Sequence, residues 1–188
     1  MFIFTDIETT GLDVYADDIL ALGIIITRDD FTEVARREWI LKLERDIIED
    51  LSPKVVEMHE ASGLFTSCRQ SRLSAEDVES QAIAFIKEYC PEAAPMAGNS
   101  IHFDRAFLKV CMPELEKAYH YRNFDVSTLR LLCHATVPGA KDWKSSRHKA
   151  HTPIADLENS LEELAHWRRV LVNSPRSYLD ADGNLQSL

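Results

Sequence analysis

The chain has 188 residues, of which 45% are hydrophobic, and a formal net charge of −10 at pH 7. This length suits one compact α/β domain, and the excess of acidic side chains argues against a long grip on duplex nucleic acid through Lys and Arg. A short oligonucleotide is compatible with the charge, because it offers few phosphates and divalent ions can supply positive charge. We expect a single domain over residues 1–174 and a loosely held tail over residues 175–188.

The cysteines and the N terminus carry no sign of a secreted or membrane protein. Four cysteines contain no Cys-x-x-Cys pair, so we expect them to be reduced. No charged region precedes an apolar stretch at the N terminus, and no segment is apolar and long enough to span a membrane. The default expectation is a soluble, cytoplasmic protein.

The first half of the chain predicts three antiparallel strands followed by two helices. Residues 1–5, 19–27 and 34–43 have the composition of strands. A Ser-Pro pair favours a helix over residues 52–63, and a second helix with apolar residues at helical spacing is expected over residues 74–89.

The second half predicts alternating strands and helices. We expect short strands at 95–99 and 121–126, helices at 100–111, 127–133 and from Thr152 onward, and a basic loop at 137–150. Together these elements outline an α/β fold with a mixed five-stranded sheet and helices on both faces. This outline is compatible with a ribonuclease H-like architecture.

Asp6 and Glu8 follow the first apolar run and are two residues apart. The period of a strand places both carboxylates on one face, where they repel each other unless a cation lies between them. Carboxylate oxygens suit hard ions such as Mg²⁺ and Mn²⁺. The pair therefore indicates a metal site, although an isolated pair of this kind more often caps a strand in solvent.

Two further acids and a histidine are embedded in apolar sequence at the predicted helix starts. Asp104 and Asp156, taken alone, are more often solvated or capping residues. With Asp6 and Glu8 they could hold two divalent ions about 4 Å apart, as in two-metal phosphoryl transfer. His151 is close enough in sequence to Asp156 to act as a general base, although a capping histidine is the commoner outcome.

Residues 6–12 (DIETTGL), 99–104 (NSIHFD) and 151–156 (HTPIAD) resemble, in order, the three motifs of the DEDDh family of 3′→5′ exonucleases. Within that family, residues 112–116 (MPELE) and 120–129 (HYRNFDVSTL) are most similar to oligoribonucleases. Residues 61–64 (ASGL) add a weaker local match.

The resemblance implies that Asp6, Glu8, Asp104 and Asp156 ligate two Mg²⁺ or Mn²⁺ ions and that His151 is the general base. It also implies a homodimer that hydrolyses short single-stranded RNA to mononucleotides. The implied substrate contacts are Leu12 on a base, Ser100, Arg122 and Ser127 on the 5′ phosphate, and Tyr121 reaching the site of the partner subunit.

The base pocket departs from the oligoribonuclease pattern at one position. These enzymes line the base pocket with a Trp upstream of the ASGL stretch, whereas Lys54 or Val55 falls there in this chain. Without the family match, Arg122 and Tyr121 would read as an ordinary surface pair.

Two alternative functions stay open at this point. A broader DEDDh exonuclease could trim longer RNA or single-stranded DNA, guided by the basic residues between Lys141 and Lys149, although such a run is more often plain solvated surface. A non-catalytic binding module is disfavoured, because four clustered carboxylates without a metal are electrostatically costly.

Overall fold

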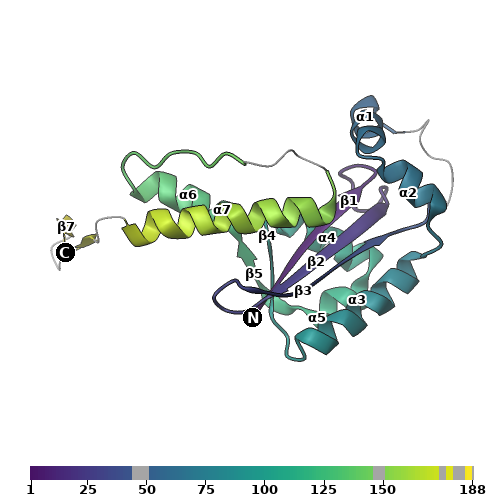
Figure 1. The fold of residues 1–188 in the computed structure, drawn as a ribbon, viewed down its shortest axis with the longest axis horizontal. Helices are drawn as coiled ribbons and strands as arrows, with labels where there is room; N and C mark the ends of the chain where they lie inside the picture. The colour runs from purple at the N-terminus through teal and green to yellow at the C-terminus, as the bar shows by residue number, and fades with distance from the viewer. Residues whose placement is uncertain (44–50, 146–150, 174–176, 180–184, 188) are drawn as a thin grey trace.

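A five-stranded mixed sheet in the order β3-β2-β1-β4-β5 forms the centre of the computed structural model (Figure 1). The first three strands are antiparallel neighbours, whereas β4 runs parallel to β1 and β5 runs parallel to β4. This arrangement confirms the predicted sheet. The strands are β1 (Phe2–Thr9), β2 (Ile19–Thr27), β3 (Glu33–Ile40), β4 (Pro95–Gly98) and β5 (His120–Asp125). The structure describes residues 1–43, 51–145, 151–173, 177–179 and 185–187.

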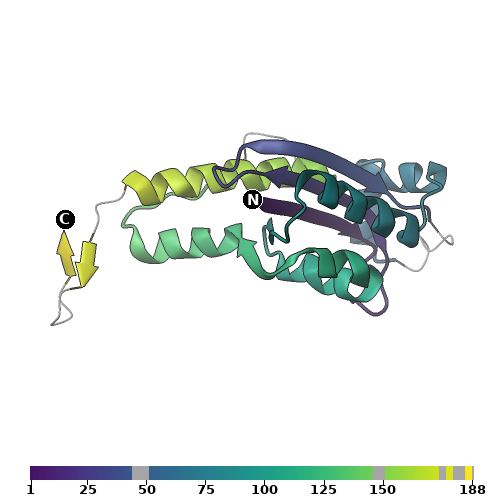
Figure 2. The ribbon, with the colours of Figure 1, turned by 90° about the horizontal axis from the view of Figure 1, so that it is seen from below.

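Helices cover both faces of the sheet, as the sequence predicted (Figure 2). On one face, Ile3 and Ile7 of β1 belong to an apolar cluster shared with α3 (Ala75–Tyr89), α4 (His102–Cys111) and α5 (Pro113–Ala118). On the other face, Phe4 belongs to a cluster shared with α6 (Val126–Thr136) and α7 (Pro153–Asn173). Successive residues of β1 thus alternate between two cores, and the even-numbered residues face α7.

β1 is longer than the sequence predicted. The expected strand ended at residue 5, but pairing with β2 continues, with Asp6 opposite Gly23 and Glu8 opposite Ala21. Backbone hydrogen bonding to β2 therefore carries the strand through both acids. Because they lie within a strand, their shared face is fixed by the sheet.

Two short helices were not predicted. The predicted helix at 52–63 is α1 (Pro53–Ala61), but Gly63, with a φ of 74°, is followed at once by α2 (Leu64–Gln70). α2 buries Leu64 beside β2, and α5 begins at Pro113 directly after α4. Each helix has only about two turns or fewer, too few residues to show a clear period.

The N terminus of α7 is docked tightly on the sheet. A Cβ at Gly23 would lie 2.6 Å from Cβ of Pro153, so only glycine lets the helix approach this closely. Oε1 of Glu38 in β3 also accepts a hydrogen bond from the backbone N–H of Ile154 at 3.1 Å. These contacts fix the start of α7, and with it Asp156, over the end of β1.

The remaining predictions concern the loop, the tail and the cysteines. Residues 137–145 contain no helix or strand, and the rest of the predicted basic loop, 146–150, lies outside the described residues. In the tail, β6 (Ser177–Leu179) pairs antiparallel with β7 (Leu185–Ser187). All four cysteines are free thiols.

Among the described residues, none of the helices has the length and apolar character needed to cross a membrane.

Candidate active site

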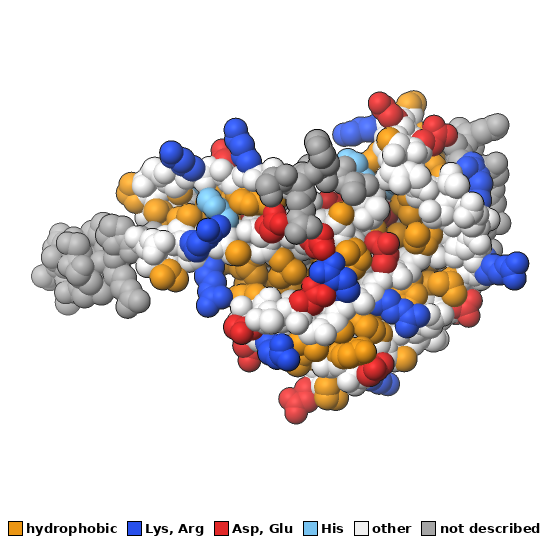
Figure 3. Space-filling view, in the orientation of Figure 1, with side chains coloured by type: hydrophobic (Ala, Val, Ile, Leu, Met, Phe, Trp, Pro, Cys, Tyr) orange, Lys and Arg blue, Asp and Glu red, His pale blue; other side chains and the backbone are white. Residues whose placement is uncertain are grey.

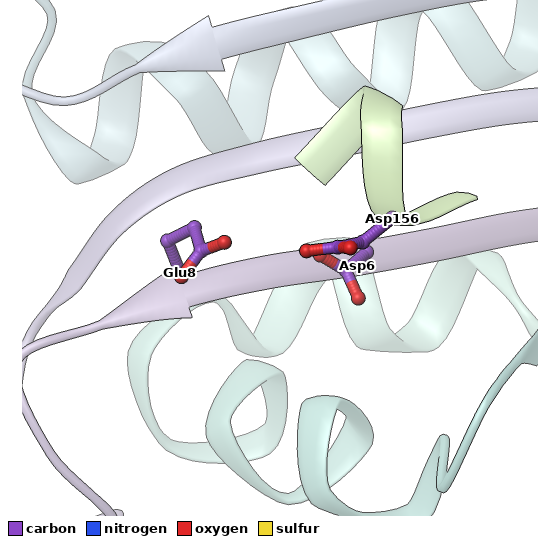
Figure 4. A group of neighbouring side chains, drawn as sticks. All are labelled: Asp6, Glu8 and Asp156. Carbon is purple, nitrogen blue, oxygen red and sulfur yellow. The ribbon is translucent and has the colours of Figure 1, made fainter. Parts of the chain in front are cut away.

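Three carboxylates meet near the carboxyl end of β1 (Figure 4). Asp6 and Glu8 come from the strand and Asp156 from the first turn of α7. Each offers one carboxylate oxygen, and these three atoms lie within 4.8 Å of one another. Three oxygen donors this close together have the chemistry and spacing of a site for a hard divalent cation.

Asp104 lies beside this group and is held by the backbone of β1. Its Oδ1 accepts a hydrogen bond from the N–H of Ile7, the residue between the two strand acids, at 3.0 Å. β4 pairs with β1 only at Ile3 and Phe4, so the edge of β1 is free beyond that point. Asp104 on α4 therefore takes a place that a longer β4 would have filled.

Burial and mutual repulsion disfavour the charged forms of these acids. Burial, followed by the charges of Asp104, Asp156 and Glu8, raises the pKa of Asp6 well above its usual range. Burial and the neighbouring acids raise the pKa of Glu8 to about 8, and burial raises the pKa of Asp104 to about 7. Each shift means that the charged form is disfavoured here unless positive charge is supplied. A bound divalent cation would supply it.

His151 and Ser100 lie two residues before the first residues of α7 and α4, the helices that carry Asp156 and Asp104. Both have left-handed backbone conformations, with φ values of 47° and 51°. Such conformations are uncommon for residues other than glycine and concentrate at functional sites. His151 lines a cavity together with Asp6 and Asp156, so the predicted general base does reach the carboxylate site.

The structure adds two residues that sequence reasoning missed. His59 on α1 is fully buried: its Nε2 bonds the carbonyl of Thr9 at 2.9 Å, and its Nδ1 lies 4.0 Å from Oε2 of Glu8. The charge of Glu38 in β3 contributes to the raised pKa values of Asp6 and Glu8. Neither residue has a local sequence signal, because both approach the site only through tertiary folding.

An apolar cavity of about 600 Å³ opens on the Glu8 side of the carboxylates. Leu12, predicted to contact a base, lines it and is 82% exposed. The segment that lacks the Trp of oligoribonucleases contributes Lys54 and Val55 to the wall, while Phe103 supplies an aromatic ring. The cavity is lined by residues 7–12, Asp17, residues 51–52, Lys54, Val55, Met58 and Phe103.

A polar cavity of about 580 Å³ opens on the other side of the carboxylates. Of its described lining residues, all but Trp143 have polar or charged side chains. It is lined by Asp6, Asn99, Arg130, Asp142, Trp143, Ser145, His151, Asp156, Asn159, Ser160 and Glu163. The carboxylates thus stand between an apolar and a polar cavity.

Of the predicted phosphate ligands, Ser100 and Ser127 come together. The backbone N–H of Ser100 donates to Oγ of Ser127 at 3.0 Å, and that hydroxyl donates to Oδ1 of Asn99 at 3.2 Å. Arg122 and Tyr121 lie on β5 at the sheet edge, where the guanidinium is 5.3 Å from the centre of the tyrosine ring. The contacts of the described residues do not join this pair to the serines.

Charges on the face that carries α7 are mixed. Figure 3 shows Lys and Arg side chains gathered over the ends of α6 and α7 near the C terminus, and acidic side chains nearer the start of α7. No broad basic track crosses the described part of this face, in keeping with the net charge of −10. Such a surface suits a short ligand better than a long duplex.

Comparison with known families defines the class of protein. The model of the RNase T family, described as Exonuclease, matches residues 3–164. The match covers most of the chain and spans all five acidic and histidine positions of the site. The chain belongs to this exonuclease family.

Similar proteins place it further, among the oligoribonucleases of that family. The chain is 36% identical over 173 residues to an oligoribonuclease from Ruthia magnifica, covering 91% of this chain and 96% of the relative. It is 37% identical over 176 residues to one from Thiobacillus denitrificans, with 92% and 95% covered. A probable oligoribonuclease from Schizosaccharomyces pombe is 36% identical over 170 residues, with 88% and 66% covered.

Solved structures confirm the fold. Escherichia coli exonuclease I in complex with a dT13 oligonucleotide matches with a TM-score of 0.70 and 16% identity over 91% of this chain. A zinc-bound form of an exonuclease I complex with single-stranded DNA has a TM-score of 0.71. This chain spans about 40% of the exonuclease I chain in the first of these structures. The ribonuclease H-like exonuclease fold expected from the sequence is therefore confirmed.

Proposed function

We propose that this protein is a metal-dependent 3′→5′ exoribonuclease that hydrolyses RNA fragments of a few nucleotides to 5′-mononucleotides. The observation that carries the proposal is the meeting of Asp6, Glu8 and Asp156 within 4.8 Å, beside Asp104 and His151. Family membership and the names of the relatives support the reaction and the substrate class.

The donor set fits divalent cations. All four acids offer oxygen ligands, and the raised pKa values of Asp6, Glu8 and Asp104 reflect burial and repulsion that a cation would relieve. We assign Asp6, Glu8, Asp104 and Asp156 as ligands of two ions, Mg²⁺ or Mn²⁺. When bound, such ions would activate the attacking water and neutralise charge on the phosphate and on the leaving 3′ oxygen.

His151 serves as the general base. It lines the polar cavity with two of the acids, and an imidazole is the side chain that ordinarily titrates near neutral pH. Its ring takes the proton of the attacking water, while the carboxylates would hold the ions that neutralise the phosphate. The left-handed backbone of His151 directs the chain into the start of α7, and so keeps the base and Asp156 together.

The substrate lies across the carboxylates. Leu12 packs on the 3′-terminal base in the apolar cavity, where Phe103 adds an aromatic wall. Ser100 and Ser127 bind the 5′ phosphate on the other side. Their position there follows from the hydrogen bond between Ser127 and Asn99, a residue in the wall of the polar cavity. A substrate of two nucleotides would engage both cavities at once.

We assign Arg122 and Tyr121 to substrate contacts in a homodimer. Tyr121 is 74% exposed on the edge strand β5, and Arg122 is exposed beside it. In the proposed dimer, Arg122 adds charge at the 5′ phosphate and Tyr121 reaches the site of the partner subunit. The exposure of both side chains at a sheet edge leaves them available for such contacts.

The direct test is hydrolysis of a 5′-phosphorylated dinucleotide with Mn²⁺, analysed by separation of the mononucleotide product. Excess chelator should abolish the activity, and Glu8→Gln should lower it while the fold is retained. Activity that persists in excess chelator would exclude the metal mechanism. Absence of product with either metal would reject the function.

A further inference from the structure

We propose that Trp143 and Arg130 form a binding subsite for the nucleotide on the 5′ side of the scissile phosphate. In this subsite Trp143 stacks on the nucleobase, and the guanidinium of Arg130 pairs with the 5′ phosphate. The inference rests on the proposed function and deepens it, because it assigns the polar cavity to one unit of the substrate.

Trp143 lies next to the reacting groups and is held there by packing. It lines the polar cavity together with Asp6, Asp156 and His151, yet it also packs against the apolar cluster between the sheet and α7. An indole held in this way offers a rigid surface next to the reacting groups. Aromatic side chains in that position bind nucleobases by stacking, with little dependence on base identity.

The segment around Trp143 is anchored on both sides. Nε2 of His134 on α6 lies 3.1 Å from Oδ1 of Asp142, and Oγ of Ser145 donates to Oδ1 of Asn159 on α7 at 2.7 Å. These contacts tie residues 142 and 145 to the two helices that border the cavity. Little side-chain ordering is then needed when a base binds, which favours affinity.

Arg130 is placed to meet the 5′ phosphate. It lies one turn after Ser127 on α6, and residues three apart on a helix share a face. The same face therefore carries Ser127, whose hydroxyl donates to Asn99 in the cavity wall, and Arg130, which lines the cavity itself. Arginine suits a phosphate because its planar fork can donate two hydrogen bonds.

Glu163, the ion-pair partner of Arg130, leaves part of the guanidinium available to an anion. Its NH1 lies 3.7 Å from Oε1 of Glu163, and the arginine side chain is 47% exposed. The Glu163 carboxylate already accepts closer hydrogen bonds from Asn99 at 2.9 Å and Trp167 at 3.0 Å. Arg130 is also the only Lys or Arg among the described residues that line this cavity.

Tryptophan fluorescence isolates the proposed contact. The chain has three tryptophans, and Trp39 and Trp167 are 2% and 0% exposed, so a ligand in the polar cavity reaches Trp143. The probe is a 5′-phosphorylated diuridylate whose bridging 3′ oxygen is replaced by a methylene group, which prevents cleavage. Binding to the native protein with Mg²⁺ should quench the emission, and Trp143→Phe should remove the quenching but keep binding within about threefold.

Affinities measured by calorimetry test the two side chains separately. Trp143→Ala should weaken binding about tenfold, as expected for one lost stacking contact. Arg130→Ala should weaken the 5′-phosphorylated probe about tenfold and the unphosphorylated probe much less. Arg169→Ala is the matched control, because it removes a guanidinium from α7 that does not line the cavity, and it should bind as the native protein does. Circular dichroism checks that each variant is folded.

The outcomes separate this inference from the proposed function. If the native protein hydrolyses dinucleotides but shows no quenching, and the Trp143→Phe and Arg130→Ala variants bind both probes with native affinity, the subsite is overturned while the function stands. If the native protein neither binds nor hydrolyses dinucleotides, the proposed function fails and the subsite with it.

Discussion

The backbone N–H of Ile7 donates a hydrogen bond to Oδ1 of Asp104 at 3.0 Å, and so joins α4 to β1 between the two strand acids. Asp104 is 5% exposed, so this bond is made out of reach of bulk water. The carboxylate thus has two tasks: it completes the hydrogen bonding of β1 and contributes charge to the proposed metal site. The two tasks can be separated by substitution.

Asp104→Asn keeps an acceptor for the Ile7 N–H but removes the charge. We expect its stability without metal to match or exceed that of the native protein, while the rate of RNA hydrolysis falls by at least about 100-fold. Asp104→Ala also leaves the buried N–H without a partner, which should lower the free energy of unfolding by about 1–3 kcal/mol. Urea unfolding and initial rates measure the two effects. Equal stabilities for the Asn and Ala variants would show that the hydrogen bond has no structural role.

The raised pKa of Glu8 predicts a stability that depends on pH in the metal-free protein. The pKa rises from 4.5 to about 8 on folding, so between these values the folded protein binds more protons than the unfolded chain. The free energy of unfolding must therefore fall as the pH rises through this window. The penalty is absent below about pH 4 and complete above about pH 8.

Glu8→Gln isolates this contribution. In chelator, the loss of stability between pH 5 and pH 8 should be smaller in the variant than in the native protein by more than about 1 kcal/mol. Adding Mg²⁺ should stabilise the native protein more at pH 8 than at pH 5, because the ion favours the charged carboxylates. The same pH dependence in both proteins would contradict the assigned environment of Glu8.

Removal of the proposed base should affect the rate and leave the metal site intact. His151→Ala is expected to lower the hydrolysis rate by roughly 10²–10⁴ while calorimetry shows Mn²⁺ binding close to native. His102→Ala is a suitable control, because His102 is exposed on α4 and lines neither cavity. A native rate in His151→Ala would remove His151 from the mechanism.

The close contact between Gly23 and Pro153 predicts a link between packing and metal binding. Gly23→Ala would place a Cβ 2.6 Å from Cβ of Pro153 and push the start of α7 away from β1. We expect a loss of about 1–3 kcal/mol in stability and a Mn²⁺ affinity at least about tenfold weaker, because Asp156 moves with the helix.

Leu22→Ala serves as the control for this variant. Leu22 lies in the cluster on the opposite face of the sheet, so its truncation should cost about 2–5 kcal/mol without changing Mn²⁺ affinity. If both variants lose metal affinity in proportion to stability, the position of α7 is not the cause.

Local signals in the sequence were enough for the regular elements. The strand predicted at 19–27 is found at those bounds, and Ser74 and Asp77 form the reciprocal hydrogen bonds of a capping box at the start of α3. The predictions failed where tertiary pairing decides the outcome. β1 extends through Glu8 because β2 continues beside it, and the short helices α2 and α5 have too few residues for a period.

The candidate site, too, could be predicted only in part from the sequence. The spacing of Asp6 and Glu8 predicted a shared face from strand geometry alone. His59 and Glu38 could not be predicted, because α1 and β3 bring them to the carboxylates from distant parts of the chain. Trp143 likewise stands in a segment without helix or strand, and only its packing on the α7 cluster reveals its position.

Hydrolysis of 5′-labelled RNAs of graded length would show whether this protein is an exoribonuclease for short fragments. The native protein and Asp104→Asn would be incubated with Mn²⁺ and RNAs from two to about twenty nucleotides, and the products resolved over time. We expect rapid cleavage of the dinucleotide, slow attack on the longest RNA, and an inactive variant. Progressive shortening of long RNA with no preference for the dinucleotide would contradict a specialised role on short fragments, and no cleavage at all would contradict the enzyme itself.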